Sequence, residues 1–340
     1  MRARVLTVVL LSNLVLAGSG EVRAGGYHVA ARYEVGGDGG WDYLTLDAEE
    51  GKLYVTRGDR VTVLDVGNGK AVGEIPGTKG VHGVALAKDL GRGFTSNGKA
   101  NTATIFDLKT LAIRGEVKTG AKPDAIIFDP VTRRVFVFNG DSSDATAIDA
   151  AGGTVAGTVA LGGAPEFAVA DGKGTVYVNL EDKSEVVAFD ARALKVKSRW
   201  PLAPCEEPTG LAMDTTKRRL YAGCHNQLMA VMDADSGKVL ATLPIGAGVD
   251  ATAFDAGTGL AFSSNGDGTL TVVREDMPGH FTVVENVTTQ LGARTMALDP
   301  KTHKIYLVTK FGPPPPPSVE HPHPRGAVLP GTFVVLVLAD

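Results

Sequence analysis

A short apolar strand that ends in aspartate recurs about every forty-two residues, and this repeat restricts the possible fold more than any other feature of the chain. The strand ends at Asp65, Asp107, Asp149, Asp190 and Asp233, so that successive copies are 42, 42, 41 and 43 residues apart. No segment inside the repeat shows sustained helical periodicity. A repeat of this length without helices is the size of one four-stranded blade of a β-propeller.

A second series of aspartates marks the turn after the first strand of the repeat. An Asx side chain bonds backbone amides two residues further on, so these residues predict turns on the face opposite any ligand; they are Asp47, Asp129, Asp214, Asp255 and Asp299. Seven first strands can be counted, at 43–46, 83–86, 125–128, 167–170, 210–213, 251–254 and 295–298. The last unit lacks a fourth strand after 333–338, and residues 27–35 at the other terminus can supply it, which would leave no open sheet edge. We therefore predict an all-β, seven-bladed propeller with four-stranded antiparallel blades, closed by the N-terminal strand.

The N-terminus has the pattern of an export signal. Arg2 and Arg4 precede an apolar run too short to span a bilayer, and small residues at Val22 and Ala24 suit signal cleavage. We predict a signal peptide over residues 1–24, a single propeller domain over 25–340, a periplasmic or secreted location, and no membrane insertion after cleavage. A net charge of −4 with no run of like charges favours neither nucleic acid nor a membrane surface as a partner.

Three second strands resemble a known repeat. Leu53-Tyr54-Val55-Thr56, Val176-Tyr177-Val178-Asn179 and the degenerate Phe136-Val137-Phe138-Asn139 are similar to the YVTN β-propeller repeat family of periplasmic seven-bladed propellers. The resemblance covers nearly the whole mature chain. It implies the fold and a periplasmic location; some relatives bind DNA, and related propellers include lactonases and lyases. No catalytic motif of those enzymes can be matched here.

The start of each first strand should surround the mouth of the central channel. These positions carry an unusual density of charge: Asp42, His82, Asp124, Glu166, Thr209, Asp250 and Arg294. The simplest interpretation is a solvated mouth that binds nothing. The alternative is a ligand site, in which Asp42, His82 and Asp124 offer carboxylate and imidazole ligands to a divalent metal ion such as Zn²⁺, Mn²⁺ or Ca²⁺.

The ends of the second strands should form another ring on the same face. We assign Arg57 and Lys310 there to ligand binding. The better explanation of Asn97, Asn139 and Asn265, each followed by glycine, is hairpin turns, because Asn-Gly tolerates a positive φ. A Pro-rich insertion at 311–332 should lie on this face, where Glu320, His321, His323 and Arg325 could reach a ligand, although a solvated loop is the simpler explanation.

The two cysteines should lie at neighbouring strand ends in the fifth unit. In an oxidising compartment Cys205 and Cys224 are expected to form a disulfide. The alternative is a copper site that uses both thiolates with His225 and Met229.

Three functions remain open from the sequence. The first is a non-catalytic binding or scaffold propeller that takes a small molecule or a protein at the channel mouth. The second is a metal-assisted hydrolase or lyase, lactonase-like, in which the metal polarises a carbonyl. Single-stranded DNA binding ranks third, because the predicted mouth is acidic and offers few aromatic platforms beside Trp41 and Tyr43.

Overall fold

The described chain is built almost entirely of antiparallel strands. A computed structural model describes residues 26–312 and 329–340, so the predicted signal peptide and most of the Pro-rich insertion lie outside the described residues. Its only helices there are two single turns, η1 (Lys88–Leu90) and η2 (Glu181–Lys183), and none is long and apolar enough to cross a membrane. The expectation of an all-β chain is confirmed.

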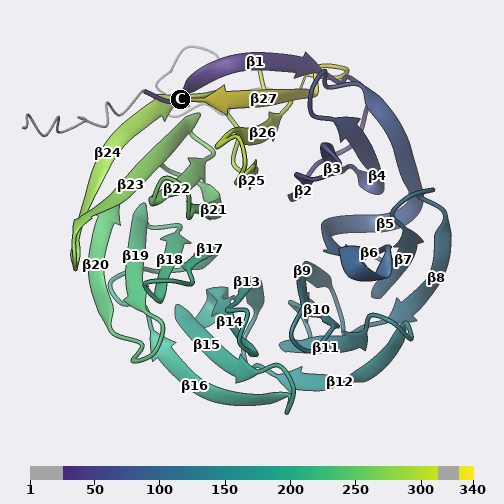
Figure 1. Ribbon diagram of the computed structural model, residues 1–340, viewed down its shortest axis with the longest axis horizontal. Coiled ribbons are helices and arrows are strands. Elements are labelled where there is room, and N and C mark those ends of the chain that lie inside the picture. Colours follow the sequence, from purple (N-terminus) through teal and green to yellow (C-terminus); the bar gives the residue numbers. More distant parts are fainter. Residues whose placement is uncertain (1–25, 313–328) are drawn as a thin grey trace, which may run out of the picture.

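The strands form sheets that are arranged radially around a central axis, as in a propeller (Figure 1). Five sheets have four strands each, running from the axis outward. They are β9 (Pro123–Asp129), β10 (Arg134–Asn139), β11 (Asp144–Asp149) and β12 (Thr154–Ala160); β13 (Pro165–Ala170), β14 (Thr175–Leu180), β15 (Glu185–Asp190) and β16 (Lys195–Pro201); β17 (Pro208–Asp214), β18 (Arg219–Cys224), β19 (Leu228–Asp233) and β20 (Val239–Pro244); β21 (Val249–Asp255), β22 (Leu260–Asn265), β23 (Thr269–Met277) and β24 (His280–Thr288); and β25 (Met296–Leu298), β26 (Ile305–Thr309), β27 (Val334–Ala339) and β1 (His28–Glu34).

A sixth sheet has seven strands because one long strand serves two neighbours. It contains β2 (Leu44–Asp47), β3 (Lys52–Thr56), β4 (Gly58–Asp65), β5 (Ala71–Ala87), β6 (Arg92–Asn97), β7 (Thr102–Asp107) and β8 (Ile113–Lys118). Most of the pairing of β5 with β4 lies between Ala71 and Pro76, whereas its pairing with β6 runs from Val81 to Ala87. Gly77 and Gly80 between the two halves have φ of +77° and +65°, values that glycine adopts readily and other residues rarely.

The two ends of the described chain meet in one sheet, which closes the ring. β1 lies antiparallel to β27, with His28 opposite Ala339 and Glu34 opposite Val334 (Figure 1). β1 therefore occupies the outer position that the C-terminal sheet would otherwise lack. The predicted closure by the N-terminal strand is confirmed, and the physical reason is that it pairs the free edge of β27.

The core lies between the faces of neighbouring sheets. The middle strands are almost fully buried, as in β10 with the pattern Arg-Val-Phe-Val-Phe-Asn, whereas outer strands such as β16 alternate between exposed and half-buried residues. Phe136 of β10 packs edge-to-face on Phe189 of β15 in the next sheet, with ring centroids 5.2 Å apart. Both faces of a middle strand pack against neighbouring sheets, so its residues form a continuous apolar run, whereas an outer strand has one exposed face.

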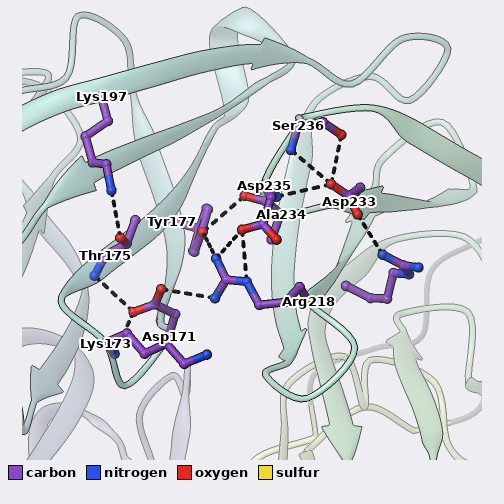
Figure 2. Close-up of polar contacts among 11 residues, drawn as sticks. Asp171, Lys173, Thr175, Tyr177, Lys197, Arg218, Asp233, Ala234, Asp235 and Ser236 are labelled. Carbon is purple, nitrogen blue, oxygen red and sulfur yellow. Dashed lines mark hydrogen bonds and ion pairs between the residues drawn. The ribbon is translucent and has the colours of Figure 1, made fainter.

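The predicted turn aspartates lie at the ends of the inner strands, and several also bind the adjacent sheet. Asp171, which was not among the predicted turn aspartates, follows β13 in the same way. It accepts backbone N–H groups of Lys173 and Thr175 through Oδ1, and its Oδ2 lies 3.1 Å from Nη1 of Arg218 in the next sheet (Figure 2). Arg218 also donates to Tyr177 and to Asp235. The same arrangement recurs as Asp47 with Lys88 and Asp255 with His303, each at 2.6 Å.

The two cysteines form a disulfide, as expected in an oxidising compartment. Cys205 precedes β17 and Cys224 ends β18, and their Cα atoms are 5.8 Å apart. Both sulfur atoms are fully buried among apolar side chains. The alternative of a copper site on two free thiolates is therefore wrong, because neither sulfur is available as a thiolate.

Candidate functional site

The starts of three consecutive inner segments bring Asp42, His82 and Asp124 together. Nδ1 of His82 lies 2.5 Å from Oδ2 of Asp42 and 3.5 Å from Oδ1 of Asp124. One ligand atom from each of the three side chains falls within 4.8 Å of the others. All three side chains keep partial exposure, between 14% and 27%, so that the cluster can be reached from solvent. The sequence predicted this grouping, and the structure places the three groups accordingly.

Hydrogen bonds hold the backbone of this cluster in place. Within the first repeat, the N–H of Asp42 donates to Oγ1 of Thr56. Two further bonds join one repeat to the next: the N–H of Tyr43 donates to the carbonyl of His82 at 3.1 Å, and the hydroxyl of Ser96 donates to the carbonyl of Asp124. Because these two contacts connect successive repeats, the positions of the three side chains depend on how the repeats pack together.

Tyr43 crosses the central channel below the cluster. Its ring belongs to an apolar group with Ala125 and Ala168, and packs edge-to-face on Phe167 at 5.1 Å. Its hydroxyl lies 3.5 Å from Oε1 of Glu166, which is 123 residues away in sequence. The side chain of Tyr43 therefore reaches from the first repeat to the fourth and contacts one of the acidic groups, Glu166.

On the opposite side of the mouth, the largely buried Asp250 forms an ion pair with the half-exposed Arg294. Oδ2 of Asp250 lies 3.0 Å from Nε of Arg294, but the orientation does not make a hydrogen bond, and this buried oxygen has no other partner among the described residues. The side chain of Asp250 is 10% exposed and that of Arg294 is 52% exposed. Asp250 is therefore a carboxylate whose charge is only partly compensated.

Burial and mutual repulsion set the protonation of these groups. Burial raises the pKa of Glu166 to about 9, and the charges of Asp124 and Asp250 add to the effect. Burial likewise raises the pKa of Asp250 to about 7, against the opposing effect of Arg294. The pKa of Asp124 rises to about 6, mainly through burial and despite His82. At neutral pH Glu166 is therefore a neutral acid, while Asp124 is largely ionised.

The pKa of His82 is also raised, but for a histidine a raised pKa favours the charged form. Burial disfavours its charged form, but the hydrogen bond to Asp42 and the charge of Asp124 outweigh burial and raise the pKa of His82.

Burial also raises the pKa of the Tyr43 hydroxyl well above its ordinary value, and the charge of Glu166 adds to this. Tyr43 is consequently a hydrogen-bond donor and not a base at any physiological pH.

Arg57 and Lys310 have structural partners instead of facing the acidic cluster. Arg57 is 2% exposed; its guanidinium donates to the carbonyls of Gly36 and Asp38 and lies 3.8 Å from the ring centre of Phe333. Nζ of Lys310 donates to the carbonyl of Gly39 at 2.6 Å. We therefore assign both cations to positioning of the segment before Trp41, a role that strand-end counting could not distinguish from ligand contact.

The Asn-Gly pairs are structural, as expected, and each begins the turn between the second and third strands of its repeat. The three asparagines are fully buried, and their side-chain amides donate across the sheet to side chains of the third strand. The glycines that follow them do not have positive φ, so the turns do not use the conformation that Asn-Gly tolerates. The asparagines also connect the two strands through their side chains, which the sequence did not indicate. Thr209 is also buried, and its hydroxyl donates to the carbonyl of Val249.

Further acidic groups near the mouth were not included in the predicted site. The charge of Glu181 adds to the effects that raise the pKa values of Glu166, Asp250 and Asp124. Glu181 also lies 3.9 Å from Nδ1 of His225, which is 3.4 Å from Glu207. Glu181 directly follows β14, the second strand of its repeat, and this position in the sequence could have indicated that it lies at the mouth. The histidines of the Pro-rich insertion and its other polar residues, over 313–328, lie outside the described residues.

The donor set of the cluster fits a hard or borderline divalent cation. One imidazole and two carboxylates provide three ligands, which is the number that a catalytic zinc site uses while a fourth position stays open to water. Oxygen-rich neighbours would equally suit Ca²⁺ or Mn²⁺. The short contact between His82 and Asp42 shows that these groups partly neutralise one another, so a cation would have to displace the His82 proton from Asp42.

Comparisons with known proteins support the propeller fold. No protein-family model matches the sequence, and no curated protein matches it. Among solved structures, the chain is similar to the structure of U3-55K (TM-score 0.76, 11% identity, covering 93% of this chain and 100% of that one). It is also similar to a chain of the mitotic checkpoint complex (TM-score 0.74, 13% identity, covering 100% and 99%) and to Kuenenia stuttgartiensis hydrazine synthase (TM-score 0.51, 15% identity, covering 70% and 96%). At these identities the similarity establishes the fold alone.

Proposed function

We propose that this chain is an exported binding propeller that uses the channel-mouth face to take a cationic group, carried by a metal ion, a small molecule or a protein partner. The observation that carries the proposal is the excess of buried acid at the mouth. Asp124, Glu166 and Asp250 all have raised pKa values because burial and their acidic neighbours disfavour the charged forms, and among residues 26–312 and 329–340 only His82 and Arg294 form ion pairs with this group. A bound cation would relieve this repulsion.

The proposal includes a finer description of the architecture. We count the seven-stranded sheet as two four-stranded blades that share β5, because its two halves pair with different neighbours and bend at two glycines. The ring then has seven blades in a single domain over 25–340. Membership of the YVTN repeat family, the signal peptide over 1–24 and a periplasmic or secreted location belong to the same proposal; the disulfide agrees with an oxidising compartment.

The test is calorimetric titration of Ca²⁺, Mn²⁺ and Zn²⁺, and of an alkylammonium ion, into protein purified from an oxidising compartment. We expect at least one of these cations to bind with one-to-one stoichiometry. Asp124→Asn should weaken that binding at least tenfold, because it removes a buried oxygen ligand that no neighbour replaces. The matched control is Asp59→Asn, whose side chain is 74% exposed. Absence of binding by all four cations would refute the proposal.

A second candidate, a metal-assisted hydrolase or lyase, is favoured by one observation. The three ligand atoms of Asp42, His82 and Asp124 lie within 4.8 Å of one another at an accessible mouth, which leaves room for a metal-bound water and a substrate carbonyl. The distinguishing experiment is hydrolysis of a lactone panel by protein loaded with the best-binding metal. Turnover that is lost in His82→Ala would favour the enzyme. Metal binding without turnover would leave the binding function.

A further inference from the structure

A second hollow on the same face lies beside the acidic mouth and has a different chemistry. It has a volume of about 820 Å³ and lies between the segment before β2, the loops that flank β21 and β22, and the chain around β25 and β26. Trp41, Leu291 and Phe311 give it apolar walls, and Arg294 lies at its border with the mouth. Its volume is within the range of small-molecule sites, which are mostly apolar with few polar groups.

The aromatic wall is held rigidly by the residues behind it. The Trp41 ring is 5.3 Å from that of Phe311 at an angle of 67°, and 5.9 Å from that of the buried Phe333. Arg57 covers Phe333 and holds the carbonyls of Gly36 and Asp38. Nζ of Lys310 donates to the carbonyl of Gly39, two residues before Trp41. An aromatic surface that is fixed before binding loses little entropy when a ligand stacks on it.

Three glycines expose backbone atoms, without side chains, at another part of the wall of the hollow. Gly248, Gly266 and Gly292 are joined in a row by backbone hydrogen bonds, from Gly266 to Gly248 at 2.9 Å and from Gly292 to Gly266 at 2.8 Å. A Cβ atom on Gly292 would lie 1.9 Å from the Phe311 ring, which means that Phe311 rests directly on this backbone. A flat backbone floor beside aromatic rings suits a planar ligand.

Two charged side chains of the described residues line the hollow, Asp267 and Arg294, and only Arg294 can donate hydrogen bonds to an anion. The carboxylate of Asp267, which also lines it, already accepts the N–H groups of Ala247 and Thr269. Arg294 is half exposed, and Asp250 is its only ion-pair partner among the described residues, with 3.0 Å between Nε and Oδ2. Its carbonyl accepts the N–H of Ala251, which fixes the backbone, and its Nη groups donate no hydrogen bond to another described residue. A guanidinium with two free nitrogens favours bidentate contact with a carboxylate.

We propose that this hollow binds a small planar aromatic carboxylate, whose ring lies against Trp41 and Phe311 and whose carboxylate pairs with Arg294. The site goes beyond the proposed cation site and does not depend on it, because its recognising groups are apolar surfaces and a cation instead of carboxylates. Arg294 lies between the two sites, since it also compensates the charge of Asp250.

The test uses Trp41 as a reporter and benzoate as the probe. The chain has two tryptophans, so that Trp200→Phe leaves Trp41 as the only one. In this background we expect benzoate to change the emission of Trp41 with a dissociation constant in the low millimolar range or tighter, as a fragment of this size gives with ordinary ligand efficiency. Cyclohexanecarboxylate, which is not flat, and benzamide, which is not charged, should each bind at least fivefold more weakly. No change with benzoate up to its solubility limit, or equal binding of all three probes, would overturn the proposal.

Two variants connect the signal to the hollow. Gly40 lines it, has no atom within 4 Å of an added Cβ and does not have positive φ, so Gly40→Leu should fill the space and weaken benzoate binding at least tenfold. Gly115→Leu is the matched control, because this glycine is equally unobstructed but lies on β8. Arg294→Gln should weaken benzoate and leave benzamide unchanged. Normal benzoate affinity in both Gly40→Leu and Arg294→Gln would show that binding occurs elsewhere.

One further variant separates this site from the cation site. Asp124→Asn should lose the cation and keep benzoate, so failure of one proposal is distinguishable from failure of the other. A parallel loss of both ligands in Asp124→Asn, with an unchanged unfolding midpoint, would contradict the assignment of two sites.

Discussion

Glu166 gives a sharp prediction about stability because its pKa of about 9 in the folded protein lies far above its ordinary 4.5. As the pH rises through 4.5, the unfolded chain releases this proton while the folded chain keeps it until about pH 9. The folded state then binds more protons than the unfolded state, so each pH unit in this interval lowers the free energy of unfolding by about 1.4 kcal/mol. The loss begins near pH 4.5 and is complete near pH 9.

Glu166→Gln removes this proton linkage while it keeps an oxygen that can accept from Tyr43. From pH 4.5 to pH 7 the loss in the wild type is at most about 3 kcal/mol, so the variant should be more stable than the wild type by up to that amount at pH 7. At pH 5 the gain should be below about 1 kcal/mol, and at pH 8 it should exceed the value at pH 7. The charges of Asp124 and Asp250 are already included in this shift of the pKa and add no separate gain.

The assay is urea unfolding of both proteins at pH 5, 7 and 8, with the free energies obtained by linear extrapolation. Glu34→Gln is the matched control, because Glu34 is an exposed residue at the end of β1, and it should change the free energy of unfolding by less than about 0.5 kcal/mol at every pH. A difference between Glu166→Gln and the wild type that does not grow with pH would refute the protonation of Glu166 in the folded protein.

Three further predictions concern the framework, each measured by urea unfolding. Replacement of Cys205 and Cys224 by serine opens a closed loop with a sequence separation of 19 and should cost about 3 kcal/mol, an effect that reductant should reproduce in the wild type. Arg218→Gln should cost about 1–3 kcal/mol, because it leaves a buried carboxylate oxygen of the neighbouring sheet without its partner (Figure 2). Gly237→Ala should cost about 2 kcal/mol or more, because a Cβ would lie 2.0 Å from the ring of Trp200 in a backbone conformation with φ of +71°.

Two controls separate the causes of these losses. Arg114→Gln removes a comparable arginine–aspartate contact that is 57% exposed on the arginine side, and it should cost less than about 0.5 kcal/mol. Gly172→Ala introduces a Cβ at φ of +68° with no atom within 4 Å, so it measures the backbone cost alone. If Arg114→Gln were as costly as Arg218→Gln, or if Gly172→Ala were as costly as Gly237→Ala, burial and steric contact would not be the cause.

The acidic cluster was predictable from the sequence, although its energetics were not. A fixed repeat places equivalent residues at equivalent heights around a ring, so Asp42, His82 and Asp124, which start consecutive inner segments, had to be neighbours. Sequence reasoning could not show that Glu166 faces Tyr43 and carries a proton, because this depends on the removal of water by side chains from the far side of the ring.

The strands, the turns, the closure by β1 and the disulfide could all be predicted from the amino-acid sequence. Each follows from information that is local or periodic: apolar runs that end in aspartate, Asx turns, a missing fourth strand and two cysteines at neighbouring strand ends. The burial of Arg57 behind an aromatic wall, and the hollow that Trp41, Phe311 and Arg294 border, became visible only in the folded protein. The physical reason is that side-chain direction and burial at a ring mouth depend on contacts between residues more than two hundred positions apart, such as Trp41 and Phe311, which no repeat spacing specifies.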